Sequence, residues 1–238
     1  MQSMLELQTP KGLKILAWAA GILMAAATWM VFFYAPLERV MGAVQRVFYF
    51  HVAAGWLGLV AFLGAGVAGV IFLVRPAKKW DVWAVALVEV GLVYALINIV
   101  TGSIWARPAW NTWWTWDPRL VTATIMELVY VAYLMLRQGI EDPERRARFG
   151  AIYAILGSVT VPLTYFSIRI WRTIHPVVIG SGSPTAEGGF DMTSSMLFTM
   201  LFSILAFTVL GMAVLWQRVR LGWLQEHVDE LRIEAMNS

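Results

Sequence analysis

The sequence contains no cysteine, and only 14% of its 238 residues are charged. The absence of cysteine excludes a disulfide framework, a thiolate metal ligand and any Cys-x-x-Cys-His motif. Any metal must therefore be held by histidine, methionine or oxygen. The low charge, together with a hydrophobic share of 59%, excludes an ordinary soluble domain. No glycine–lysine phosphate-binding loop occurs, so the chain has no nucleotide site of that type.

The hydrophobic residues fall into six runs, each about the length of a helix that crosses ~30 Å of hydrocarbon. We expect membrane spans at 15–34, 47–74, 82–105, 120–136, 149–170 and 192–216. The sequence thus predicts an all-α integral membrane protein in which residues 1–238 form a single transmembrane domain. The first run follows Lys11 and Lys14 without a convincing cleavage site, and we expect it to be retained.

Most of the basic residues gather in the N-terminal segment, in the second-to-third and fourth-to-fifth connections, and in the tail at 217–238. Lys and Arg bias short loops towards the cytoplasm, so both termini and this tail are predicted to be cytoplasmic. The third-to-fourth connection, 107–119, is then external. The net charge of +3 reports topology and gives no support for nucleic-acid binding.

The external segment 107–119 is rich in tryptophan. Its four indoles are Trp110, Trp113, Trp114 and Trp116. Such rings form either an aromatic belt in the headgroup layer or a platform for a flat apolar ligand. A belt spreads over many helix ends, so this concentration favours the platform. The spacing of Trp110, Trp113 and Trp114 also predicts a short helix that lies flat at the external surface.

Asp–Pro pairs mark two helix starts. Asp117-Pro118 precedes the fourth span and Asp142-Pro143 precedes the fifth, with Asp as N-cap and Pro at the first helical position. We expect a flexible external loop at 180–189, followed by Asp191 as the N-cap of the sixth span. Pro162 predicts a kink within the fifth span.

Two of the three histidines, His51 and His175, lie at the external ends of separate predicted spans. Two imidazoles that face each other could coordinate a haem iron from both sides. A lone histidine at this depth is more often solvated or hydrogen-bonded, and spacing alone cannot show that the two converge. His227 lies among charged residues of the tail and is given no role.

Three external arginines lie close in sequence to these candidates: Arg46, Arg119 and Arg172. Guanidinium groups pair well with carboxylates such as the two haem propionates. The alternative is that they pair with Asp117, Glu38 or lipid phosphate.

Two carboxylates, Glu89 and Glu127, fall inside predicted spans, where an unpaired charge is costly. We favour a role in helix-to-helix hydrogen bonding, in which Asn98 could take part. The alternative places both in a path for a transported substrate.

The segment Trp113-Trp114-Thr-Trp116-Asp117-Pro118-Arg119-Leu120, flanked by one external histidine on either side, resembles the tryptophan-rich signature of haem-handling membrane proteins of cytochrome c assembly. Six spans and the short length match the family of cytochrome c maturation protein C (CcmC, haem exporter protein C) over essentially the whole chain. Tyr49-Phe50-His51-Val52 and Ile174-His175-Pro176 stand where that family has its two external haem-ligand histidines.

The resemblance implies haem b, bound non-covalently at the periplasmic face of a bacterial inner membrane. The iron ligands would be His51 and His175, and the platform would be Trp110, Trp113, Trp114, Trp116 and Asp117. It further implies delivery to the periplasmic haem chaperone CcmE, beside the single-span subunit CcmD and the ATP-binding cassette subunits CcmA and CcmB.

No catalytic residue is assigned, because the chain is expected to present haem rather than to be an enzyme. Two alternatives stay open. One is a permease that carries haem or another substrate through the bundle with Glu89 and Glu127. The other is an electron-transfer subunit with haem between the spans.

Overall fold

The structure, a computed structural model, describes residues 9–38, 41–177 and 192–237. In these ranges every regular element is a helix: α2 (Lys11–Trp29), η1 (Met30–Tyr34), α3 (Gln45–Val74), α4 (Lys78–Trp110), α5 (Pro118–Gln138), α6 (Pro143–Ser158), α7 (Thr160–Ile170) and α8 (Ser194–Asn237). Joined as α2–η1, α3, α4, α5, α6–α7 and α8, they give six helices long and apolar enough to cross a membrane. This confirms the predicted fold class.

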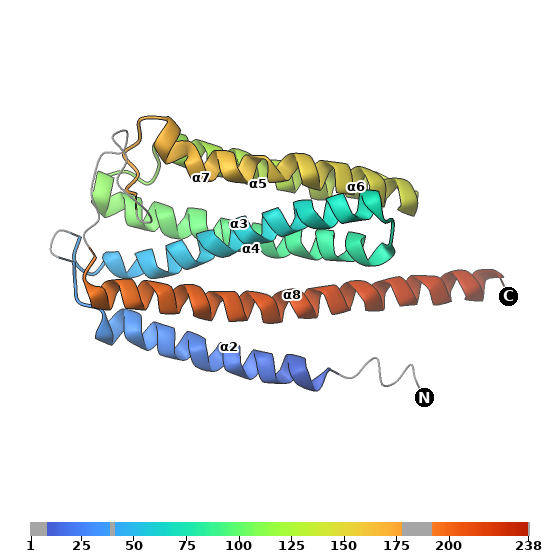
Figure 1. The fold of residues 1–238 in the computed structure, drawn as a ribbon, viewed down its shortest axis with the longest axis horizontal. Coiled ribbons are helices and arrows are strands. Elements are labelled where there is room, and N and C mark those ends of the chain that lie inside the picture. The colour runs from blue at the N-terminus through green and yellow to red at the C-terminus, as the bar shows by residue number, and fades with distance from the viewer. Residues whose placement is uncertain (1–8, 39–40, 178–191, 238) are drawn as a thin grey trace.

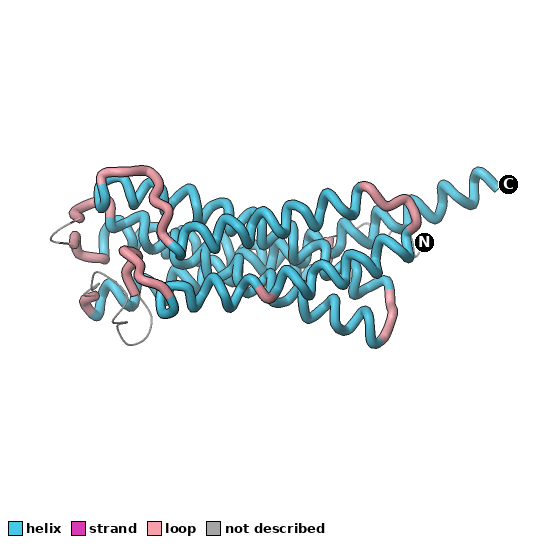
Figure 2. The backbone as a smooth tube through the Cα atoms, turned by 90° about the horizontal axis from the view of Figure 1, so that it is seen from above, coloured by secondary structure: helices cyan, strands magenta, loops and turns pink. Residues whose placement is uncertain are grey.

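The helices run side by side in one bundle (Figure 1). The α3–α4 pair lies in the middle, with α5, α6 and α7 on one side and α8 then α2 on the other. The core behind this arrangement contains stacked Phe62 and Tyr130 rings, 3.9 Å apart between centroids, which join α3 to α5. Seen from above, the loops gather at the two ends and α8 extends past its neighbours (Figure 2).

The start of α2 and the end of α8 lie at one end of the bundle, and the connection between α4 and α5 lies at the opposite end (Figure 1). This relative arrangement agrees with the expected topology. The assignment of one end to the cytoplasm stays a prediction.

The expected flat helix in the tryptophan segment is wrong. Instead, α4 continues through Pro108 to Trp110 and stops at Asn111, whose φ of 56° is left-handed. Such a residue ends a helix because the chain turns away from the helical path. The Arg107 guanidinium, in the last turn, donates to Asn111 Oδ1 at 2.7 Å. Residues 111–117 are therefore irregular, and Trp113 and Trp114 share no helical face with Trp110.

Both Asp–Pro helix starts are confirmed. Asp117 accepts from the Arg119 backbone N–H at 2.9 Å, and Asp142 accepts from that of Arg145 at 2.7 Å. The expected kink appears as an interruption at Val159, between α6 and α7. It lies close to Pro162, which has no N–H to donate to the carbonyl four residues earlier. Asp191 and the 180–189 loop lie outside the described residues.

Glu89 joins two helices, as favoured from the sequence. The Arg218 guanidinium of α8 donates to both of its carboxylate oxygens, with an Nη2 to Oε1 distance of 2.9 Å. A second forked pair, not anticipated, links Arg137 of α5 to Asp81 of α4 at 2.6 and 2.8 Å. Glu127 has no polar partner among the described residues.

Candidate functional site

The two candidate histidines converge at the end of the bundle that carries the tryptophan segment. His51 lies near the start of α3, and His175 follows the end of α7. Both line a larger cavity and a smaller neighbouring one. The two imidazoles therefore lie where the two cavities meet, which the sequence alone could not establish.

The His51 ring is held by Asn98, one helix away. Its Nδ1 lies 2.9 Å from the backbone carbonyl oxygen of Asn98, and the Asn98 side-chain amide donates to the His51 carbonyl at 2.9 Å. A carbonyl can only accept, so this contact assigns the ring proton to Nδ1. Nε2 is then the acceptor atom of the ring, with the Asn98 side-chain amide nitrogen 3.5 Å away, a place that an incoming ligand would take. A backbone carbonyl on Nδ1 is common among metal-binding histidines.

His175 is arranged in the same way. Its Nδ1 lies 3.0 Å from the backbone carbonyl oxygen of Pro176, which again leaves Nε2 as the acceptor. Burial, together with smaller effects of the nearby Arg119 charge and of His51, lowers the pKa of His175 to about 3. The ring is therefore neutral at physiological pH, and a neutral imidazole is the form that ligates a metal.

Asp117 fixes the segment that carries His175. Its buried carboxylate accepts from the Thr173 hydroxyl at 2.7 Å and from the Ile174 N–H at 2.9 Å, besides capping α5 through Arg119. The His175 N–H in turn donates to the Thr173 hydroxyl at 3.0 Å. The carboxylate thus faces the 173–174 backbone, away from the two histidine cavities. The Asp117 carboxylate therefore positions His175, a candidate iron ligand.

The four tryptophans of the segment divide into two pairs. Trp110 and Trp114 line the smaller histidine cavity, and the Trp110 ring lies 6.4 Å from the His175 ring between centroids. Trp113 and Trp116 are 59% and 84% exposed and line neither histidine cavity. Only the first pair is brought to the histidines in this conformation.

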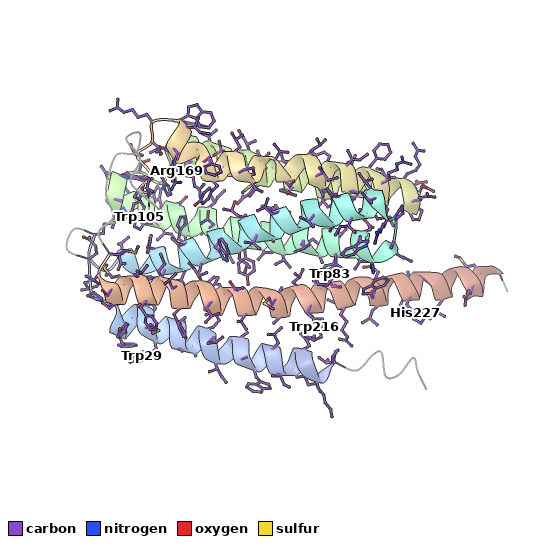
Figure 3. All side chains as sticks on the ribbon, in the orientation of Figure 1. Trp29, Trp83, Trp105, Arg169, Trp216 and His227 are labelled. Atoms are coloured by element: carbon purple, nitrogen blue, oxygen red, sulfur yellow. The ribbon has the colours of Figure 1, made fainter. Side chains whose placement is uncertain are left out.

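Trp105 is the residue that sequence analysis missed. It lines both cavities, packs edge-on against Trp110 at 5.2 Å between centroids, and has a buried Nε1 without a partner among the described residues. Trp105 lies at the same end of the bundle as Arg169, whereas Trp83 and Trp216 lie away from that end (Figure 3). Extending the predicted third span as a helix to Trp110 would have placed Trp105 on the same helix as Trp110 and pointed to it as a site residue.

Of the three candidate arginines, only Arg119 reaches the histidines, and it lines both cavities. Arg46 instead stacks on Phe32 at 5.4 Å, and Arg172 is exposed beside the outer face of the tryptophan segment. Arg169, in the last turn of α7, lines the larger cavity and was not anticipated. The cations at the site are therefore Arg119 and Arg169.

Together, the fold and this pocket define a six-helix membrane protein with paired histidines, tryptophans and arginines at one end. The chain belongs to the Heme exporter protein C family, whose family model matches residues 3–234.

Curated relatives named Heme exporter protein C cover most of the chain. The Paracoccus denitrificans protein is 31% identical over 87% of this chain and 85% of its own length. The Bradyrhizobium diazoefficiens protein is 29% identical over 92% and 83%, and the Escherichia coli K12 protein is 29% identical over 84% and 80%.

Proposed function

We propose that this chain binds haem b non-covalently at its external end and delivers it for the biogenesis of c-type cytochromes. The observation that carries the proposal is the pair of imidazoles where two cavities meet, each with its Nδ1 against a backbone carbonyl. The family and the names of the relatives support haem as the molecule handled.

The donor set and the shape of the pocket fit haem. Two neutral imidazoles are a suitable axial pair for the iron. With the iron between them, a flat macrocycle must extend on both sides of the line that joins them, and the two cavities supply space there. Trp110 and Trp114 offer flat apolar contact, and the Arg119 and Arg169 guanidiniums suit the propionates.

Five proposed haem contacts lie outside these cavities: Trp113, Trp116, Asp117, Arg46 and Arg172. Asp117 acts instead by holding the segment that carries His175. We keep Trp113 and Trp116 in the proposal as an outer rim that covers haem when the 111–117 segment closes, or that meets the receiving protein. Arg46 and Arg172 would reach propionates only through a similar rearrangement, so Arg119 and Arg169 are the stronger candidates.

The receiving protein in this proposal is the periplasmic haem chaperone CcmE, with CcmD, CcmA and CcmB as neighbouring subunits in a bacterial inner membrane. Because the sequence has no phosphate-binding loop, we assign any ATP-driven step to these ATP-binding partners. The permease interpretation has less support, because Glu89 is paired with Arg218 across α4 and α8.

The test is an absorption spectrum of the purified full-length chain, oxidised and reduced, followed by mixing with purified CcmE. We expect a low-spin spectrum typical of two imidazole ligands, and loss of haem from the chain as the chaperone gains it. A chain that binds no haem, or that keeps its haem in the presence of the chaperone, would contradict binding or delivery respectively.

A glycine of α4 provides a sharper prediction about the pocket. A Cβ atom at Gly102 would lie 2.9 Å from Cε1 of His51, so Gly102→Ala must displace this imidazole. We expect haem affinity to fall by about tenfold, the lower end of the effect of disturbing a ligand's support. The control is Gly21→Ala in α2, where a Cβ meets nothing within 4 Å. Equal haem affinities in a titration of the two variants would show that the His51 position is not critical.

A further inference from the structure

The larger histidine cavity extends into the membrane-spanning part of the bundle. Along α3 its lining runs from Phe48 past His51 to Leu59. Because an α-helix rises about 1.5 Å per residue, the stretch from His51 to Leu59 takes the cavity about 12 Å deeper than the imidazole. The site is therefore continuous with space between the spanning helices.

The polarity of the lining changes with this depth. Arg119, in the first turn of α5, and Arg169, in the last turn of α7, lie at the end that carries the histidines. Apart from the Asn98 amide of α4, the deeper lining is apolar or aromatic and includes Trp56 and Leu59 of α3 and Ile204 of α8. Tyr165 of α7 lies at the level of the arginines, because the Arg169 guanidinium is over its ring at 5.6 Å and the Arg119 guanidinium donates to the neighbouring Thr164 carbonyl. The cavity is thus cationic at the headgroup end and hydrophobic below it.

The cavity also reaches the side of the bundle. Trp56 and Tyr165 line the cavity and are nevertheless 49% and 37% exposed. Both belong to helices that span the membrane, so their exposed surfaces face lipid acyl chains. The cavity therefore borders lipid between α3 and α7.

Haem has the same distribution of polarity as this cavity. Its macrocycle is largely apolar, and its two carboxylates lie along one edge. Dissolved in a leaflet, it keeps the carboxylates at headgroup level, because an unpaired charge is costly among acyl chains. A sideways move between α3 and α7 would preserve this orientation and bring the carboxylates to the level of Arg119 and Arg169.

We propose that haem enters the histidine site from the adjoining lipid leaflet, through a portal between α3 and α7 bordered by Trp56 and Tyr165. This inference rests on the proposed function. Leu59 lies at the deep end of the portal, so a larger side chain there narrows the route without contacting the imidazoles' hydrogen-bond partners.

The experiment measures how fast the low-spin spectrum appears when the full-length chain in lipid vesicles is mixed with vesicles that contain haem. We expect Leu59→Phe to load at least about tenfold more slowly than the wild type, because added bulk must be displaced, with the same final haem content. The matched control is Leu63→Phe, one turn deeper on α3, exposed to lipid and outside the cavity. Trp56→Ala, which widens the portal, should load faster than the wild type.

Unchanged loading rates for both Leu59→Phe and Trp56→Ala would overturn the portal. So would a loss of final haem content in Leu59→Phe that matches its loss of rate, because the substitution would then damage the site itself. Should Leu59→Phe fail to fold, the rate of Trp56→Ala decides. A wild type that never develops the low-spin spectrum would overturn the proposed function and this inference together, which distinguishes the two failures.

Discussion

We expect His51→Ala and His175→Ala each to lose the low-spin haem spectrum predicted for the wild type. Each ring lies at the meeting point of the two cavities with Nε2 as its acceptor atom, so removing either leaves at most one axial imidazole. The loss of haem retention should exceed the roughly 10–100-fold that follows from losing a ligand's supporting partner. Absorption spectra and haem content of the purified variants measure both effects.

A control and a rescue separate ligation from general damage. His227→Ala removes the remaining histidine, which lies exposed in the extension of α8, and should leave the spectrum unchanged. In His175→Gly, added free imidazole should restore the low-spin spectrum, because it can occupy the space of the lost ring. A spectrum that survives in either alanine variant would show that the residue concerned is not an iron ligand.

Local signals in the sequence predicted the helices and their starts. Long apolar runs determine membrane spans, and Asp117 and Asp142 cap α5 and α6 through contacts between near neighbours. The error at residues 107–117 arose because i, i+3, i+4 spacing describes a helix only while the helix continues. The left-handed turn at Asn111 ends α4 before Trp113 is reached.

The site was harder to predict, because its contacts join segments far apart in the chain. Asn98 supports His51 through both its backbone carbonyl and its side-chain amide. The sequence marked Asn98 as a polar residue within a span, but the 47 positions between the two residues gave no sign that His51 is its partner. Arg119 and Arg172 were equally plausible by distance along the sequence, and only the packing of α5 against α7 places Arg119 beside the histidines. The tryptophan segment correctly indicated which end of the bundle carries the site, but it did not predict how far the cavities extend or which residues line them.

The second large effect is expected at Asp117. Asp117→Ala leaves the Thr173 hydroxyl and the Ile174 N–H without their buried acceptor, and each such loss costs about 1–3 kcal/mol. The free energy is lower if residues 173–176 move and form other hydrogen bonds, and this movement displaces His175. We expect haem retention to fall by about 10–100-fold, with His51 still in place. Thr173→Val, which removes one hydroxyl from the same contacts, should give a smaller loss in the same direction.

Asp142→Ala is the matched control, because Asp142 caps α6 in the same Asp–Pro context but lies at the opposite end of the bundle. Losing that cap should cost about 0.5–2 kcal/mol of stability without any change in the haem spectrum.

Asp117→Asn separates capping from positioning, since an amide oxygen can still accept while its NH₂ group cannot accept from the Ile174 N–H. If Asp117→Ala and Asp142→Ala lowered thermal stability equally and left haem retention alike, Asp117 would be only a helix cap. A loss of haem confined to the Asp117 and Thr173 variants would instead show that the tryptophan segment acts on the iron site by holding His175.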